Sequence, residues 1–297
     1  MKIKFFFLFL SLFILSSSFF NIASATMVST YHIGNSLTWD AIKKNTLIDL
    51  FANAGISLIE NHHIKCSGTL THSLANPDVT CVASSVGSWK EALAENSYDF
   101  LILQPSVGSH SLGEIATTED EISAIRSFAT KTNARLAIYE AFPYLNQAAD
   151  ISSFYHLPDQ SLFRSTEVEL AQIWDAFPNA LKIPTMQVLI NLDLLAREGN
   201  LPGMSTAQDF YRDGAHLNEF GRYALALTHF SALTGLDPSL TGLDLPEDYS
   251  SVTDQQALMV QKAVREVVLS HVPLPASILF FCTSFLVFVG FVKHKVD

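Results

Sequence analysis

The sequence is poor in cysteine and in basic residues. Its 297 residues include three cysteines, and 18 lysines and arginines stand against 29 aspartates and glutamates. It contains no Cys-x-x-Cys pair and no paired His–Cys ligand set, and the adjacent His62 and His63 would face opposite sides of a strand. We therefore expect neither a metal site nor a cofactor.

Long apolar runs are confined to the two ends of the chain. At the amino end, two lysines precede an almost wholly apolar stretch at 5–20 and the small-residue sequence Ala-Ser-Ala at 23–25. This order of basic, apolar and small residues is typical of a secretory signal peptide. We expect residues 1–25 to be such a peptide and not part of the fold.

The carboxyl end carries a second apolar run. Val-Pro-Leu-Pro at 272–275 precedes apolar residues 276–292 and then Lys-His-Lys. The run is just long enough for a membrane helix, and its basic end would stay in the cytoplasm. The arrangement resembles the PEP-CTERM sorting signal, although Leu274 stands where glutamate is usual. The resemblance implies cleavage by an exosortase-type enzyme and release outward; the alternative is a plain membrane anchor over 272–297.

The remaining body, residues 26–271, suits one α/β domain that works outside the cytoplasm. Leaving out the four lysines and the one aspartate of the two ends gives it a formal charge of −14. Such a charge repels phosphate backbones, so we expect no nucleic-acid partner. Acylated sugars and lipid esters meet no such barrier. Cys66 and Cys81, 15 residues apart around a loop, are a reasonable disulfide in an oxidising compartment.

The body alternates between predicted strands and predicted helices. A buried strand with apolar residues throughout, such as 99–104, is typical of a parallel sheet covered on both faces. We expect a three-layer α/β/α sandwich with a parallel, five-stranded, flavodoxin-like sheet. The predicted strands are 27–33, 57–64, 99–104, 135–141 and 181–184, and the predicted helices are 39–54, 88–95, 118–132, 165–177, 185–197, 218–234 and 253–269.

A serine and a histidine lie near opposite ends of this body, each in a setting that suits catalysis. Ser36 follows the first strand in Gly-Asn-Ser-Leu, and His216 closes Asp-Gly-Ala-His just before a helix. A serine nucleophile needs a base, and the base needs an acceptor that fixes its tautomer. Asp213 could be that acceptor. Ligands of such sheets bind at the carboxyl ends of strands, and Ser36, Gly68 and Gln104 each follow a strand.

At these residues the chain resembles the SGNH hydrolases, also called GDSL-type esterases and lipases. Gly-Asn-Ser-Leu matches the first block of that family, with Asn35 where aspartate is usual, and Asp213 to His216 match its closing Asp-x-x-His block. The resemblance implies the SGNH fold, a Ser36–His216–Asp213 triad, and an oxyanion hole formed by Ser36 and Gly68. The family's third block, Gly-x-Asn-Asp, is missing, and Gln104 stands in its place as a candidate third donor.

The most direct interpretation is a secreted serine esterase that needs no cofactor and cleaves acyl esters. The resemblance and the outward location favour acetyl groups on an exopolysaccharide. Two alternatives remain open: an O-acyltransferase with the same triad, and a non-catalytic carbohydrate-binding matrix protein, which the missing third block favours. Ser205, in Gly-Met-Ser-Thr-Ala, lacks the strand and helix that a nucleophile elbow requires, so we interpret it as a loop serine.

Overall fold

The computed structural model describes residues 27–106, 116–142 and 161–271. The segments predicted as a signal peptide and as a sorting signal or anchor lie outside these residues. Within the described part of the chain, no helix combines the length and the apolar character that a membrane crossing requires.

Five parallel strands form one sheet in the order β2-β1-β3-β4-β5. This is the strand order of the doubly wound, flavodoxin-like sheet that we expected. The strands are β1 (Met27–Gly34), β2 (Ser57–Ile64), β3 (Phe100–Leu103), β4 (Arg135–Tyr139) and β5 (Leu181–Ile183).

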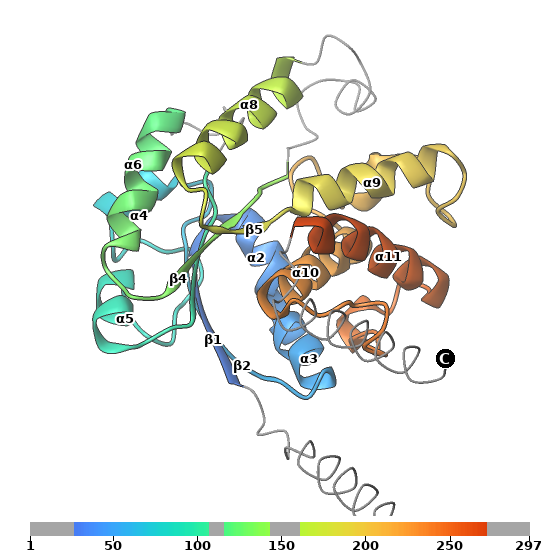
Figure 1. Cartoon of the computed structure of the whole chain (residues 1–297), viewed down its shortest axis with the longest axis horizontal. Coiled ribbons are helices and arrows are strands. Elements are labelled where there is room, and N and C mark those ends of the chain that lie inside the picture. The colour runs from blue at the N-terminus through green and yellow to red at the C-terminus, as the bar shows by residue number, and fades with distance from the viewer. Residues whose placement is uncertain (1–26, 107–115, 143–160, 272–297) are drawn as a thin grey trace, which may run out of the picture.

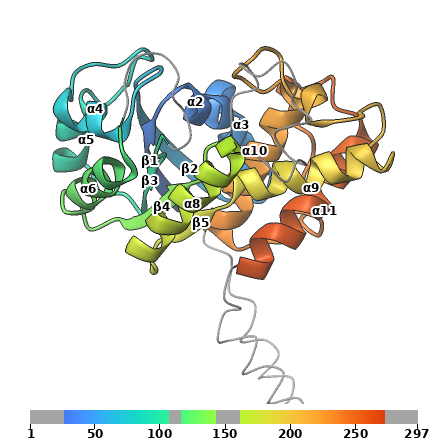
Figure 2. The ribbon, with the colours of Figure 1, turned by 90° about the horizontal axis from the view of Figure 1, so that it is seen from above.

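Helices cover both faces of the sheet (Figure 1). The α-helices are α2 (Ser36–Ile42), α3 (Thr46–Asn53), α4 (Leu70–Ala75), α5 (Trp89–Glu95), α6 (Thr118–Ala129), α8 (Ser161–Ala176), α9 (Thr185–Arg197), α10 (Glu219–Thr234) and α11 (Asp254–His271). Short 3-10 helices are η1 (Lys43–Asn45), η2 (Ala207–Phe210) and η3 (Glu247–Tyr249). Figure 2 shows the sheet between α4, α5 and α6 on one side and α10 and α11 on the other.

The alternation of side chains along β1 divides the apolar core into two clusters. Tyr31 and Ile33 are fully buried against the α4, α5 and α6 side. Ile102 and Tyr139, from strands further along the sheet, point to the opposite face, where they pack with α10. Successive side chains of a strand face opposite layers, so a sheet covered on both faces needs apolar residues at nearly every position. Two separately packed layers therefore hold the sheet rigid behind the loops at its edge.

The helix expected over 39–54 is wrong in its start and in its continuity. It begins at Ser36, because the Asn35 side chain accepts the Leu37 N–H and caps the first turn. It then breaks at η1, where Asn45 adopts a left-handed φ of 61° before α3 begins. The early start matters, since it places Ser36 in the first turn of a helix instead of in a free loop. Helix α4 lies between Cys66 and Cys81, where neither a helix nor a strand was predicted.

The topology brings three chain segments to one edge of the sheet. In the order 2-1-3-4-5, the chain reverses its direction of winding between β1 and β3. In sheets of this kind, ligands bind at the carboxyl ends of the strands beside such a reversal. Ser36 follows β1 after one residue, Gln104 follows β3 directly, and Gly68 lies in the loop after β2. The candidate site lies at this edge.

Candidate active site

Ser36 is the first residue of α2, directly after the turn that ends β1. The turn is tight: a Cβ on Gly34 would lie 2.1 Å from Thr38 Oγ1 and 2.9 Å from Gln104 Oε1. Glycine is therefore required at this position, because the side chains of Thr38 and Gln104 leave no room for a Cβ. The Ser36 N–H is one of the helix-start donors that intrahelical bonding leaves free, and it has no partner among the described residues. This N–H is available to a ligand beside the Ser36 hydroxyl.

His216 and Asp213 lie on a short loop between η2 and α10. An antiparallel bridge between Tyr211 and Leu217 closes the loop, and Arg212 N–H donates to the His216 carbonyl at 3.0 Å. Within it, the Asp213 carboxylate accepts the His216 N–H at 2.8 Å. The loop thus fixes the backbone of both residues before their side chains interact.

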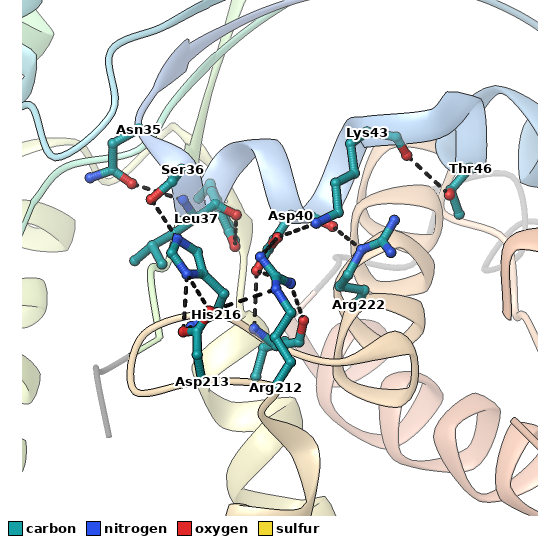
Figure 3. Close-up of polar contacts among 12 residues, drawn as sticks. Asn35, Ser36, Leu37, Asp40, Lys43, Thr46, Arg212, Asp213, His216 and Arg222 are labelled. Atoms are coloured by element: carbon teal, nitrogen blue, oxygen red, sulfur yellow. Dashed lines mark hydrogen bonds and ion pairs between the residues drawn. The ribbon is translucent and has the colours of Figure 1, made fainter. Parts of the chain in front are cut away.

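The structure brings Ser36, His216 and Asp213 together (Figure 3). His216 Nε2 lies 3.1 Å from Ser36 Oγ, and His216 Nδ1 lies 3.0 Å from each carboxylate oxygen of Asp213. The serine and the aspartate engage opposite nitrogens of one imidazole, so Nδ1 carries the proton and Nε2 is free to accept one. A nucleophile, a base and an orienting acid are thereby aligned.

The charge of Asp213 is secured by its surroundings. Partial desolvation raises the pKa of Asp213, but the N–H groups of Ala215 and His216 and the His216 ring outweigh that effect and hold the pKa below its usual value. The carboxylate is half exposed, at 49%, and the imidazole is 28% exposed. Asp213 is therefore an anion at neutral pH, and it favours the imidazolium that forms during proton transfer.

The side-chain oxygen of Gln104 points to the turn between β1 and α2 that carries Ser36. Gln104 Oε1 accepts the Asn35 N–H at 3.1 Å and the Thr38 hydroxyl at 2.8 Å. These two donors fix which end of the amide is oxygen. Among the residues that the structure describes, its Nε2 makes only a long contact, 3.5 Å, with the Pro105 carbonyl. The visible role of Gln104 is thus to hold the start of α2, and its role as an oxyanion donor stays a prediction.

The backbone of Gly68 forms hydrogen bonds that the sequence did not lead us to expect. Its N–H donates to the Lys65 carbonyl at 2.9 Å, and its own carbonyl accepts the Asn35 side-chain N–H at 3.2 Å. The N–H that was expected to bind an oxyanion therefore already closes a turn. Cys66, in the same loop, forms a disulfide with Cys81, which lies beyond α4, and the S–S distance is 2.03 Å. The structure places Gly68 beside the site, and its oxyanion role stays a prediction that this geometry does not support.

A buried carboxylate that the sequence analysis missed joins the two loops of Gly68 and Gln104. Glu121 of α6 is fully buried and accepts the N–H groups of Leu70 and Thr71 at the start of α4, the Thr71 hydroxyl, and the Ser106 N–H two residues after Gln104. Burial raises the pKa of Glu121, although these hydrogen bonds act against the shift. Glu121 stands in a helix with an ordinary amphipathic pattern, so the sequence does not indicate this role.

No group of histidine, cysteine and acidic side chains able to hold a metal exists in the described part of the chain. His62 and His63 lie on β2 and face opposite sides of the sheet, with the His62 ring 5.3 Å from the Trp39 ring. Ser205 lies in a turn before η2, where its N–H donates to Asp209.

Comparison with known proteins shows the fold. No protein-family model matches the sequence, and no curated protein matches it. A DUF4886 family protein from Bacteroides uniformis ATCC 8492 aligns with a TM-score of 0.62 and 17% identity, over 82% of this chain and 95% of that chain.

Two further solved structures align more loosely. A candidate SGNH hydrolase from Slackia heliotrinireducens has a TM-score of 0.46 and 19% identity, over 70% of this chain and 99% of that one. TesA has a TM-score of 0.44 and 12% identity, over 70% and 98%. The alignment with the DUF4886 family protein, at a TM-score of 0.62 and 17% identity, shows a shared α/β fold. The chemistry must be argued from the site itself.

Proposed function

We propose that the protein is a serine ester hydrolase in which Ser36 is the nucleophile, His216 the general base and Asp213 its orienting acid. The observation that carries the proposal is the pair of contacts to one imidazole, 3.1 Å from Nε2 to Ser36 Oγ and 3.0 Å from Nδ1 to Asp213. Both distances lie within the range that proton transfer requires without any movement of the backbone.

The reaction proceeds in two steps with a covalent intermediate. As Ser36 Oγ attacks the ester carbonyl, His216 Nε2 takes the hydroxyl proton and Asp213 stabilises the imidazolium. The tetrahedral intermediate collapses when its C–O bond to the alcohol breaks, and His216 returns the proton to the departing oxygen. A water molecule, deprotonated by His216, then attacks the acyl-serine and releases the acid and the Ser36 hydroxyl.

The developing oxyanion is bound by the Ser36 N–H, the free backbone donor beside the nucleophile. The Gly68 N–H can become a further donor only if it leaves the Lys65 carbonyl when substrate binds. Gln104 can become one only if its Nε2, now 3.5 Å from the Pro105 carbonyl, turns to the substrate. Loss of a single donor typically costs about 10²–10³ in rate. We therefore expect a modest catalytic rate compared with hydrolases that have a complete, preformed hole.

The proposed substrates are acyl esters of carbohydrates or lipids, with acetyl groups of an exopolysaccharide favoured. The predicted signal peptide and the apolar carboxyl end support a secreted or cell-surface location. The resemblance of the carboxyl end to a sorting signal supports processing by an exosortase-type enzyme. Neutral acyl sugars approach such a surface without the electrostatic penalty that polyphosphates meet.

The test is hydrolysis of p-nitrophenyl acetate and labelling by a fluorophosphonate probe. Both should be present in the wild type and absent in Ser36→Ala, while Ser205→Ala, which changes a serine outside the site, should leave both unchanged. His216→Ala should also abolish labelling. Turnover that survives in Ser36→Ala, or that disappears equally in Ser205→Ala, would remove Ser36 from the mechanism.

The engaged Gly68 N–H supports one alternative, a carbohydrate-binding protein that kept the fold without a working oxyanion hole. This alternative predicts that the intact protein binds an acetylated polysaccharide without releasing acetate. Release of acetate by the wild type and not by Ser36→Ala would exclude it. An acyltransferase would instead move the acetyl group to an added acceptor sugar, which analysis of the products separates from hydrolysis.

A further inference from the structure

A buried carboxylate lies one helical turn after the nucleophile. Asp40 is four residues after Ser36 in α2 and is 1% exposed. Its Oδ1 accepts from Lys43 Nζ at 2.8 Å and from Arg212 Nη2 at 3.1 Å, and its Oδ2 accepts from Arg212 Nη1 at 3.3 Å and from the Leu217 N–H at 3.0 Å. All of its strong acceptor positions are thus occupied, by two cations and one backbone donor.

Two of these partners flank His216 on its loop. Arg212 lies at the start of the loop and Leu217 at its end, and the Arg212 guanidinium also donates to the Leu217 carbonyl. Figure 3 shows Arg212 reaching from the loop to Asp40 while His216 reaches to Ser36. The loop and the helix therefore meet at two points, the imidazole–hydroxyl contact and the contact of the loop's base with Asp40.

The two contact points lie on rigid units. Residues four apart in a helix share one face, so Ser36 and Asp40 keep a fixed separation as long as α2 is intact. The loop is closed by the Tyr211–Leu217 bridge and by the Arg212–His216 backbone hydrogen bond. A single hydrogen bond at 3.1 Å would leave the loop free to pivot about it. A second, charged and bidentate attachment removes that freedom.

We infer that Asp40, through Arg212 and the Leu217 N–H, is a positioning residue that sets the distance from His216 to Ser36. This inference rests on the proposed function and goes beyond it by assigning the device that assembles the triad. Asp40 has a second effect. Arg212 Nε lies 3.7 Å from Asp213 Oδ2, so the Asp40 carboxylate keeps the guanidinium in place beside Asp213 and prevents it from displacing His216.

The first test replaces Asp40 and Arg212, one at a time and together. Asp40→Asn keeps the shape but removes the charge, and Arg212→Gln removes the bidentate donor. We expect each to lower kcat on p-nitrophenyl acetate by roughly 30- to 100-fold with KM changed less than about 3-fold, because misplacement of a reacting group by about 1 Å costs this much. The rate of fluorophosphonate labelling should fall in parallel. The double variant should lose about as much as either single variant, since both act through one contact.

Lys43→Gln is the matched control. Lys43 pairs with the same carboxylate as Arg212 but does not touch the loop of His216. If Asp40 acts by holding that loop, Lys43→Gln should keep kcat within about 3-fold of wild type while Arg212→Gln does not. If Lys43→Gln and Arg212→Gln lower kcat equally, Lys43 and Arg212 serve only to neutralise the buried charge of Asp40, and the inference is wrong.

A crystal structure of Arg212→Gln tests the inference independently of any activity. We expect Ser36 Oγ and His216 Nε2 to move beyond hydrogen-bond distance, and an unchanged distance overturns the inference even if the wild type proves to be inactive. Conversely, a wild type that neither hydrolyses esters nor reacts with the probe, but whose triad opens in Arg212→Gln, overturns the proposed function and not the positioning role. Because the Arg212 side chain is 38% exposed, this variant also carries the test if Asp40→Asn does not fold.

Discussion

The side-chain amide of Asn35 donates to the Gly68 carbonyl at 3.2 Å while its oxygen accepts the Leu37 N–H at 3.0 Å. One side chain thus both caps the helix of the nucleophile and holds the loop after β2. Aspartate, which is usual at this position in the family that the motif resembles, could form the cap but could not donate to Gly68. The departure from that motif therefore has a structural reason in this chain.

Replacing Asn35 by aspartate tests this reading. In Asn35→Asp a carboxylate oxygen would face the Gly68 carbonyl, leaving a buried acceptor unsatisfied at a cost of about 1–3 kcal/mol. The added negative charge beside Ser36 would also oppose an oxyanion. We expect a lower melting temperature and a fall in kcat/KM of about 10-fold or more. Stability and activity equal to wild type would show that the Asn35–Gly68 contact is dispensable.

Gly34→Ala should break the turn that presents Ser36. Its Cβ would lie 2.1 Å from Thr38 Oγ1 and 2.9 Å from Gln104 Oε1, so the Thr38–Gln104 hydrogen bond could not persist. We expect a loss of about 1–3 kcal/mol in the free energy of unfolding, measured by urea denaturation, because the added methyl overpacks a closed site. Adding Thr38→Ala removes the nearest clashing atom and should recover part of the loss. Additive losses would contradict this account.

Glu121→Gln should loosen both loops at the edge of the sheet. Glutamine offers one acceptor oxygen where the carboxylate offers two, and its NH₂ group would face N–H donors of Leu70, Thr71 or Ser106. We expect a destabilisation of about 2 kcal/mol in chemical denaturation. Glu119→Gln, an exposed change on the same helix, should stay within about 0.5 kcal/mol of wild type. Equal effects of the two variants would refute the role assigned to Glu121.

Glu140, buried at the end of β4, should make stability depend on pH. Burial raises the pKa of Glu140 to about 7, against the smaller effects of hydrogen bonds from the start of α9 and from Trp174. Between pH 4.5 and 7 the folded protein therefore retains a proton that the unfolded chain releases. The contribution of Glu140 to the free energy of unfolding falls as the pH rises through that window, by up to about 3 kcal/mol. Above the window this contribution is constant.

The measurement compares urea denaturation of wild type and Glu140→Gln at pH 5 and pH 7.5. The variant cannot titrate at this position, so its stability should fall less between the two pH values. Burial lowers the pKa of His63 and of His229 to about 4, which opposes the trend at the acid end, but it does so in both proteins and cancels in the difference. Parallel curves for the two proteins would show that Glu140 does not hold its proton in the folded state.

The fold was predictable because its signals are local. The apolar runs at 99–104 and 135–141 indicate buried strands, and their alternation with helices restricts the sheet to a parallel, doubly wound form. The start of α2 was not predicted, because capping by Asn35 competes with the turn preference of Gly-Asn-Ser and the sequence does not show which prevails.

The alternation of strands and helices was enough to predict a parallel sheet covered on both faces. The Asp213–His216 pair was also predictable, since two residues three apart on one loop need no distant partner. The groups that lie across the site from this pair could not be predicted, because they come from distant parts of the chain. The Asp40–Arg212 ion pair joins residues 172 apart, and the hydrogen bonds of Gln104 and Gly68 depend on how three loops pack. Hydrophobic patterning encodes which face of an element is buried, whereas the direction of one amide or guanidinium is set by neighbours that only folding supplies.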